Sequence, residues 1–325
     1  MLSIPILHSA DAGQRLDRFI RKYLPSAPLG GIYKMLRTGK IKVNGKKKDQ
    51  TYILELNDEV NFWLTEEEIQ KLKWNQTESA SLETSKVVKK NIQKPLEVLY
   101  EDDYILVINK VSGINVHPGD HKTTEISVID QVQDYLKWKY DSLTFRPALV
   151  HRIDRDTSGC LLIAKDKWAL ERLLSDLQSH KMEKIYHTIV VGIPSEKQDT
   201  IRAKLLRIEN AKNEAKVRVD ENGQSATTHF SFLQKIELNQ NFSLLECRIE
   251  TGRTHQIRVH MAHIWHAVVG DRAYGDKRIN SYVLRELGIS RQLLHARTLS
   301  FLHPKTNKRL SIQAPYPEDF ARLLS

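Results

Sequence analysis

A polar stretch over residues 66–93 divides this chain into two parts of different character. Glu, Lys, Ser, Thr, Asn and Gln dominate it, Trp74 is its only aromatic residue, and its few apolar residues keep no helical or strand period. Such a segment cannot bury enough apolar surface to order itself. We therefore expect a flexible linker over residues 66–93, between a small domain at 13–65 and a larger one at 94–325.

The part before the linker holds the positive charge of the chain. Residues 14–48 contain eleven Lys and Arg and one acid, Asp17, so this window alone matches the net charge of +10 carried by all 325 residues. A run of charged residues usually forms a solvent-exposed surface with no specific partner. One confined to a small folded segment favours a polyanionic partner such as a nucleic acid.

The same segment predicts a small α/β domain. In residues 15–24 apolar side chains recur at i, i+3, i+4 and i+7, which is the spacing of an amphipathic helix. A second short helix is expected over residues 31–38. A strand over residues 41–43 then runs into an Asn-Gly turn, and another strand follows at 60–64.

The part after the linker predicts a large sheet. Continuous apolar runs at residues 105–108, 161–164 and 188–191 are typical of strands buried on both faces. Alternating patterns near residue 230 and at 242–249 indicate further strands. A helix is expected between the second and third runs, where leucines recur at helical spacing: Leu170, Leu173, Leu174 and Leu177. The fold class is therefore α+β with a mixed sheet.

The densest polar cluster of this part is VHRIDRDTSG, at residues 150–159, directly before a predicted buried strand. Loops at strand ends are a common place for functional groups. Two carboxylates, Asp154 and Asp156, stand among arginines, and a nearby arginine favours the ionised form of an aspartate. The alternative is an ordinary turn with exposed ion pairs.

A second cluster, TGRTHQIRVH, lies at residues 251–260. Thr254 is expected to cap a helix on which Arg258 lies one turn further, on the same side. A buried arginine needs an anionic partner. Asp154 is the natural candidate.

These motifs in this order resemble the pseudouridine synthases of the RluA family. HRIDRDTSG before LLIAKD, and TGRTHQIRVHMAH before GDRAYGD, carry the resemblance, which runs over residues 95–314 and stands nearest the RluC-type enzymes of bacterial large-subunit (23S) ribosomal RNA. The helix, helix, GKIKVNGK order at 13–65 resembles the S4-like RNA-binding module. Val111 and Ala267 depart from the family, which usually has proline there.

The resemblance implies a fold and a set of roles. The fold is a mixed or antiparallel-sheet pseudouridine synthase catalytic domain with a small N-terminal S4-like α/β RNA-binding domain. Asp154 corresponds to the catalytic carboxylate, Tyr186 to the active-site tyrosine, Arg258 to the arginine paired with the aspartate, and Arg152 to a residue used on RNA around the extruded nucleotide. Asp156 is expected to hold the loop by accepting backbone or arginine hydrogen bonds.

The reaction implied is isomerisation of specific uridines to pseudouridine, which requires no cofactor and no metal. The partner implied is large-subunit ribosomal RNA or its assembly intermediate, bound by a cytoplasmic monomer with no membrane association. Six basic residues of the N-terminal segment are the candidate RNA contacts: Arg15, Arg18, Lys34, Arg37, Lys40 and Lys42.

Four alternatives remain open. The protein could be a non-catalytic RNA-binding ribosome assembly factor, or it could act on transfer RNA. Asp154-Arg-Asp156-Thr157 superficially resembles the motif of aspartyl phosphotransferases, but His151 and Arg152 interrupt the strand which that class requires. Histidines at helical spacing could ligate zinc, although neither a cysteine nor a clear carboxylate completes the ligand set: His255, His260, His263 and His266.

Overall fold

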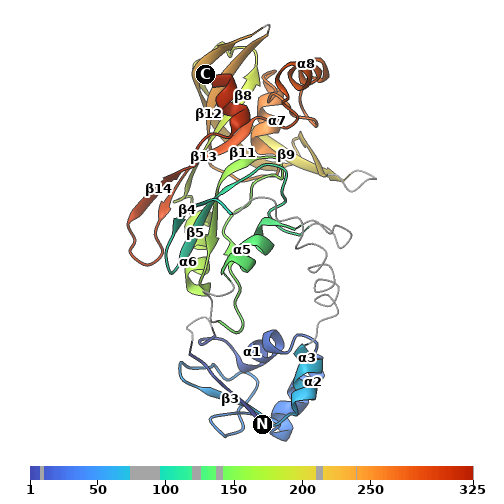
Figure 1. Ribbon diagram of the computed structural model, residues 1–325, viewed down its shortest axis with the longest axis vertical. Helices are drawn as coiled ribbons and strands as arrows, with labels where there is room; N and C mark the ends of the chain where they lie inside the picture. Colours follow the sequence, from blue (N-terminus) through green and yellow to red (C-terminus); the bar gives the residue numbers. More distant parts are fainter. Residues whose placement is uncertain are drawn as a thin grey trace. The chain divides into compact units, whose positions relative to one another are not determined.

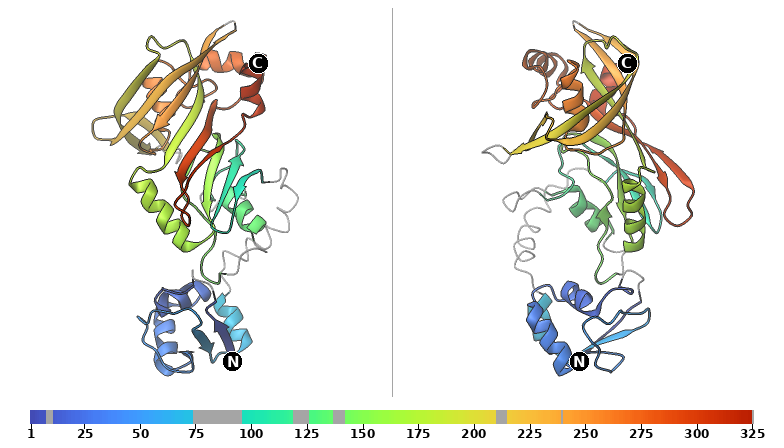
Figure 2. Two further views of the ribbon diagram at one scale, coloured as in Figure 1. Left: turned by 90° about the vertical axis from the view of Figure 1, so that its left-hand side faces the viewer. Right: turned by 180° about the vertical axis from the view of Figure 1, so that it is seen from behind.

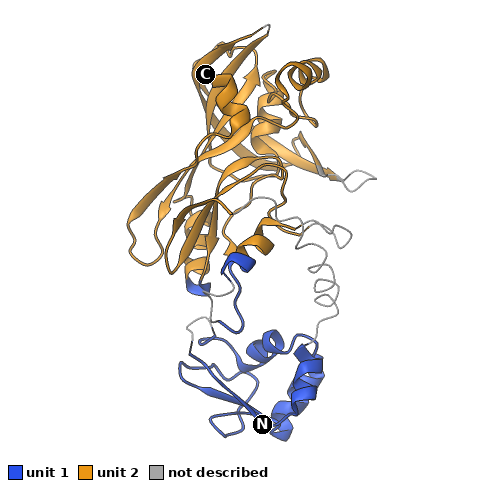
Figure 3. Ribbon diagram, viewed as in Figure 1, with its two compact units in different colours: residues 1–95, 133–147, 166–168 blue, residues 96–132, 148–165, 169–325 orange. Residues whose placement is uncertain are grey.

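The computed structural model describes residues 1–7, 11–73, 96–118, 126–136, 142–209, 215–238 and 240–324. The chain forms two compact units (Figure 3). Unit 1 comprises residues 1–95, 133–147 and 166–168, and unit 2 comprises residues 96–132, 148–165 and 169–325. Among the described residues, no helix combines the length and the apolar character that crossing a bilayer demands.

In its described residues up to 73, unit 1 is a small α/β unit with three helices and a three-stranded antiparallel sheet (Figure 1). In chain order its elements are β1 (Leu2–Pro5), α1 (Leu16–Tyr23), α2 (Leu29–Thr38), β2 (Ile41–Val43), β3 (Glu59–Phe62) and α3 (Glu66–Lys73). The predicted helices and strands are present, with α2 beginning two residues early, after Pro28. Asn44 and Gly45 adopt φ of 51° and 71°, as the turn after β2 requires.

The expected linker is wrong at its start, because residues 66–73 form α3. Thr65 and Glu68 cap this helix reciprocally: the Glu68 amide donates to Thr65 Oγ1 at 3.1 Å, and the Thr65 amide donates to Glu68 Oε2 at 2.8 Å. Ile69 is buried in the core of unit 1 with Leu72 packed against it. Two apolar contacts and a capping box order a segment whose composition is otherwise polar. Residues 74–93 lie outside the described residues.

Unit 1 also extends beyond the expected boundaries of 13–65. Its β1 pairs with β3 from before residue 13. Asp11 binds residues 142–144, which belong to the same unit: its carboxylate accepts from the Leu143 and Thr144 amides, both at 2.9 Å, and from Thr144 Oγ1 at 2.6 Å. A single division near residue 93 therefore does not describe this part of the chain.

Unit 2 is built on one mixed sheet of eleven strands (Figure 1). The sheet order is β10 (Ala215–Val219), β9 (Gln198–Glu209), β11 (Gln224–Glu237), β12 (Asn241–Ile249), β8 (Glu183–Val191), β13 (Leu294–Leu302), β7 (Ser158–Ala164), β5 (Ile105–Lys110) and β4 (Val98–Glu101). β14 (Arg309–Gln313) pairs with β13, and β6 (Ala148–Leu149) with β7. The predicted α+β class with a mixed sheet is confirmed.

The helices after the linker complete the fold: α5 (Val128–Leu136), α6 (Lys167–Gln178), α7 (Gln256–His263), α8 (Lys277–Leu287) and α9 (Glu318–Leu324). α6 packs in a core with β5 and β7, and α8 and α9 pack in a second core with β8 and β12. α7 packs against β9, β10 and β11, with α8 beside it in Figure 1 and Figure 2.

One parallel strand pair among the described strands, β7 with β13, positions the polar cluster at residues 150–159. Gly159 lies opposite Ala296 with φ of 110°. A Cβ at this position would stand 2.3 Å from the Ala296 carbonyl oxygen, so only glycine permits the strands to approach this closely. The loop that precedes β7 is therefore set directly against the β13–β8 region of the sheet.

Candidate active site

The two polar clusters meet in an ion pair. Arg258 of α7 donates through Nη1 to Asp154 Oδ2 at 2.9 Å, across 104 positions of sequence. The Arg258 side chain is 8% exposed and the Asp154 side chain 24% exposed. The pairing expected between these residues is present, with the guanidinium buried and the carboxylate partly open to solvent.

A second carboxylate, which the sequence reasoning missed, anchors the arginine. Arg258 Nε and Nη2 donate to the two oxygens of Asp271 at 2.7 and 3.0 Å. Asp271 has no exposed surface and also accepts from the Ala273 and Tyr274 amides at 2.9 and 3.1 Å. Two parallel hydrogen bonds fix a guanidinium in orientation as well as position. The sequence feature that could have indicated this residue is its position as the first aspartate of the GDRAYGD motif.

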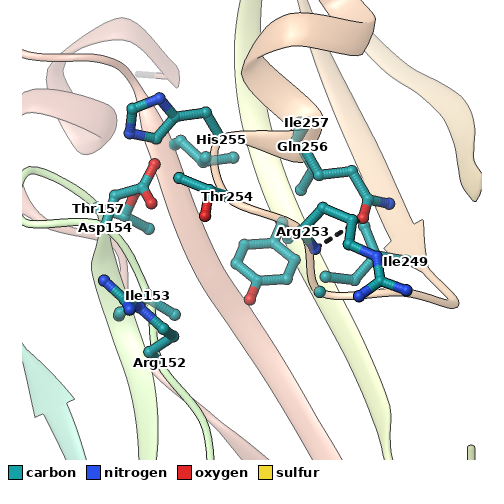
Figure 4. A pocket seen from close by; sticks show the side chains of 13 residues that line it. Arg152, Ile153, Asp154, Thr157, Ile249, Arg253, Thr254, His255, Gln256 and Ile257 are labelled. Atoms are coloured by element: carbon teal, nitrogen blue, oxygen red, sulfur yellow. Dashed lines mark hydrogen bonds between the residues drawn. The ribbon is translucent and has the colours of Figure 1, made fainter. Parts of the chain in front are cut away.

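The start of α7 differs from the expectation that Thr254 caps it. His255 is the N-cap, in the left-handed region at φ of 53°, and no side chain caps the helix. Gln256 orders the preceding turn instead, since its Oε1 accepts from Thr251 Oγ1 at 2.7 Å and from the Arg253 amide at 3.1 Å. This turn brings Thr254 and His255 to the same pocket as Asp154 (Figure 4).

Tyr186 of β8 lines the pocket that contains Asp154. Its side chain is buried, and β8 places it opposite Cys247 of β12 and Ala296 of β13. Burial, together with the charge of Asp154, raises the pKa of the Tyr186 hydroxyl well above its usual range. The hydroxyl is therefore protonated at neutral pH, and the Tyr186 ring lines the same pocket as the Asp154 carboxylate.

Two further cations hold the loop of Asp154. Lys110, at the end of β5, is 2% exposed and donates to the main-chain oxygens of Arg155 and Thr157 at 2.7 and 2.8 Å. Burial lowers the pKa of Lys110 to about 7. Arg291 donates to the main-chain oxygen of Asp156 at 3.0 Å. The Asp156 carboxylate, expected to hold the loop, accepts no hydrogen bond from a described residue; its main-chain oxygen does so instead.

Comparison with known proteins decides the family of this site. Residues 104–263 match the family model described as RNA pseudouridylate synthase. Ribosomal large subunit pseudouridine synthase C of Vibrio cholerae is 36% identical over 94% of this chain and 90% of its own length. The protein of that name from Escherichia coli is 35% identical over 99% of this chain and 96% of its own. The chain belongs to the RNA pseudouridine synthase family. Its members are isomerases.

Solved structures of pseudouridine synthases share the fold. Human RNA Pseudouridylate Synthase Domain Containing 4 aligns with a TM-score of 0.57 at 22% identity, over 75% of this chain and 96% of that one. Human RNA Pseudouridylate Synthase Domain Containing 1 aligns with a TM-score of 0.55 at 24% identity, over 68% and 84%. The α+β architecture of this pseudouridine synthase is therefore that of its family.

The predicted RNA contacts of this pseudouridine synthase fall into two groups. Lys34 and Arg37 line a hollow of about 570 Å³ in unit 1, together with Lys47 and Lys48, which the prediction omitted. Arg18 is exposed. The remaining predicted residues already have partners: Arg15 pairs with Asp17 at 2.7 Å, Lys40 pairs with Glu68 at 3.7 Å, and Lys42 lies 4.5 Å from the Trp63 ring.

The histidines near α7 have hydrogen-bonding roles in this pseudouridine synthase. His255 Nδ1 lies 2.8 Å from the Tyr274 hydroxyl, and the Tyr274 ring lies 5.2 Å from the Arg258 guanidinium. His260 Nδ1 lies 3.0 Å from Thr228 Oγ1. Within the described part of the chain, no group of three or more His, Cys, Asp or Glu is arranged to hold a metal ion.

Proposed function

We propose that this protein isomerises specific uridines to pseudouridine in large-subunit ribosomal RNA, as a monomer in the cytoplasm, with Asp154 as the catalytic carboxylate. The observation that carries the proposal is the partly exposed Asp154, held by the buried Arg258–Asp271 pair and lining one pocket with Tyr186. The ribosomal substrate is inferred from the names of relatives that align over nearly the whole chain.

The isomerisation breaks the bond between uracil N1 and ribose C1′ and forms a bond between uracil C5 and the same C1′, while the proton on C5 is lost and N1 gains one. An ionised carboxylate at C1′ can attack it, and one beside the ribose can remove a proton from the sugar. Arg258 binds Asp154 Oδ2, and Oδ1 has no hydrogen-bond partner among the described residues. One oxygen is thus held while the other faces the substrate.

Tyr186 supports the same chemistry from the other wall of the pocket. Its ring gives the extruded uracil a flat surface on which to stack. The raised pKa keeps the Tyr186 hydroxyl protonated at neutral pH, so it is available to donate a hydrogen bond to the uracil rather than to act as a base.

The enzyme must also extrude the uridine, which costs a few kcal/mol. Arg152 is exposed at the rim of the pocket and makes no hydrogen bond or ion pair with a described residue, so its guanidinium is available to the RNA. The basic hollow of unit 1 supplies further phosphate contacts. Affinity is then expected to fall with salt, because phosphate neutralisation releases counterions.

Asp154→Asn tests the proposal. We expect tritium release from 5-³H-uridine-labelled large-subunit RNA to fall by more than about 10³-fold, while the Kd for RNA changes little, because the neutral amide keeps the shape and loses the charge. Asp156→Asn, two residues away, is the matched control and should remain active. Appreciable turnover by Asp154→Asn would show that another carboxylate is catalytic.

Mapping of pseudouridines with and without the gene tests the substrate. We expect sites to disappear from large-subunit RNA and to remain in transfer RNA. Loss confined to transfer RNA would overturn the ribosomal assignment, and the same release assay on the two purified RNAs would confirm which one is modified.

A further inference from the structure

A second hollow, of about 590 Å³, adjoins the Asp154 pocket in unit 2. The two share a wall formed by five residues: Arg152, Tyr186, Ile249, Gly252 and Arg253. A strand of RNA that places one nucleotide at Asp154 would therefore have the neighbouring part of its backbone at this second hollow. Its lining also includes Lys184 and His151, which the catalytic arrangement described above does not use.

Lys184 is a buried cation without a partner among the described residues. It lies on β8, two residues before Tyr186, and is 8% exposed. Its ammonium makes no hydrogen bond or ion pair with any described residue. Gly252 lies close to this ammonium, since a Cβ on Gly252 would stand at an ordinary contact distance of 3.7 Å from Lys184 Nζ. Burial lowers the pKa of Lys184.

His151 adds a buried donor beside this ammonium. Its Nε2 accepts from the Leu162 amide at 3.2 Å, which leaves the proton of the neutral ring on Nδ1. Nδ1 is shielded from solvent and has no partner in the described structure. Burial, with a contribution from the charge of Lys184, lowers the pKa of His151 to about 3, so the ring is neutral.

These two groups are costly for the folded protein. A buried cation without a counterion and a buried donor without an acceptor each reduce stability. Arg152 and Arg253, both exposed in the same lining, add further positive charge. Glu250 is the acidic residue that lines this hollow, and its Oε1 lies 2.6 Å from His229 Nε2. An anion from outside the chain would balance the charge of Lys184, whereas a neutral base would leave the ammonium unbalanced.

We propose that Lys184, in the wall that it shares with His151, forms a subsite for one backbone phosphate of the substrate RNA, adjacent to the uridine at Asp154. This inference rests on the proposed function, because it takes the RNA strand to be the occupant of the Asp154 pocket. The subsite fixes the register of the strand: the phosphate held by Lys184 sets which nucleotide reaches the carboxylate.

Lys184→Met is the first test, since methionine has a similar length and no charge. We expect RNA binding to weaken about 10-fold, as loss of a charge-assisted hydrogen bond predicts, and the slope of log K against log salt to fall by roughly 1. The melting temperature should be unchanged or higher, because an unbalanced buried charge has been removed. A residue needed only for folding would give a lower melting temperature and the wild-type salt slope.

Lys235→Met is the matched control. It removes one positive charge from β11, where Lys235 pairs with Glu237, away from both hollows. We expect its affinity and salt slope to stay near those of the wild type. An equal loss in both variants would show a general charge effect and would overturn the subsite. Should Lys184→Met fail to fold, Lys184→Gln carries the same comparison.

Neutral methylphosphonate linkages identify the ligand. They are introduced one at a time around the uridine that mapping identifies. We expect the wild type to lose affinity at one position, and Lys184→Met to lose nothing further there. The backbone assignment would be wrong if Lys184→Met and the neutral linkages lowered the affinity additively at every position. It would also be wrong if inorganic phosphate competed with RNA while no single neutral linkage lowered the affinity. If the wild-type protein forms no pseudouridine, the proposed function is wrong. If the wild type is active and Lys184→Met keeps the RNA affinity and salt slope of the wild type, only this subsite is wrong.

Discussion

At the scale of single residues, the site depends on one guanidinium shared between two carboxylates. Asp271 occupies Nε and Nη2 of Arg258, which leaves Nη1 directed at Asp154. Asp271 is in turn held by two backbone amides. Asp154, the proposed catalytic carboxylate, therefore meets a cation whose position the fold already sets, and a preorganised charge needs no rearrangement during a reaction.

Asp271→Asn should lower the rate of the chemical step more than it lowers affinity. The amide cannot accept from both Arg258 nitrogens, so the guanidinium shifts, and a misplacement of about 1 Å at a reacting group costs about 10²-fold in rate. We also expect a loss of about 3 kcal/mol in the free energy of unfolding, since a buried charge loses its partner. Single-turnover kinetics and urea unfolding measure the two effects.

Asp276→Asn is the control for that change. Asp276 caps α8 by accepting from the Arg278 and Ile279 amides at 2.7 and 2.9 Å, and asparagine is an equally good cap. It does not touch Arg258. A similar fall in rate for both variants would mean that Asp271 has no particular part in placing the guanidinium.

At the scale of elements, the start of β7 determines where the Asp154 loop lies. The apolar run predicted a strand at residues 161–164, but β7 begins at Ser158 because its first residues pair with His295 and Ala296 of β13. His295 also lies 2.9 Å from Ser158 Oγ through Nδ1. Pairing with a distant strand, rather than local apolar content, extends this element toward the site.

Gly159→Ala should destabilise the protein strongly. Its Cβ would meet the Ala296 carbonyl oxygen, in addition to the strain of a positive φ. Gly113→Ala is the matched control, because Gly113 has φ of 89° and nothing within 4 Å of a Cβ. We expect about 1–3 kcal/mol for the control and a clearly larger loss for Gly159→Ala in urea unfolding. Equal losses would show that β7 and β13 do not approach so closely.

Within unit 1, the two groups of predicted RNA contacts should respond differently. Lys34 lines the basic hollow, and no described residue pairs with its ammonium. Arg15 is bound to Asp17. Lys34→Gln should reduce the slope of log K against log salt by roughly 1, and Arg15→Gln by less, with the rate at saturating RNA unchanged in both. Filter binding at several salt concentrations measures this, and the reverse order would contradict the role of the hollow.

At the scale of the whole molecule, three histidines with lowered pKa values make the fold sensitive to acid. Burial lowers the pKa of His151 to about 3 and those of His260 and His295 to about 4. Below pH 6.5 the unfolded chain binds protons at these positions that the folded chain does not. Their contribution to stability is therefore complete above pH 6.5 and is lost as the pH falls toward 4.

We expect the free energy of unfolding to fall between pH 6.5 and 4 with a slope that approaches about 1.4 kcal/mol per pH unit for each of these histidines. Urea unfolding at pH 7.5, 6 and 5 measures the slope. His295→Gln should reduce it, and His263→Gln, at an exposed position, should leave it unchanged. A stability independent of pH over this range would refute the burial of these rings as neutral groups.

The amino-acid sequence alone was sufficient for the elements and for the two central partners. Apolar periods indicated α1, α2 and the buried strands because hydrophobic spacing is a local property. The polar clusters around Asp154 and Arg258 stood out because each is compact in sequence. The linker at residues 66–73 was predicted wrongly, since a capping box and one buried isoleucine outweighed a polar composition.

Only the tertiary structure identified Asp271 as the anchor of Arg258, Lys110 as the residue that holds the Asp154 loop, and Lys184 as a buried cation without a counterion among the described residues. The physical reason is that a hydrogen bond requires atoms within about 3 Å, and the pairs involved here are set by strand register and by the start of α7. The residue type alone does not show whether a lysine is exposed to solvent or buried. Its surroundings, which residues far away in the chain provide, determine what its charge can bind.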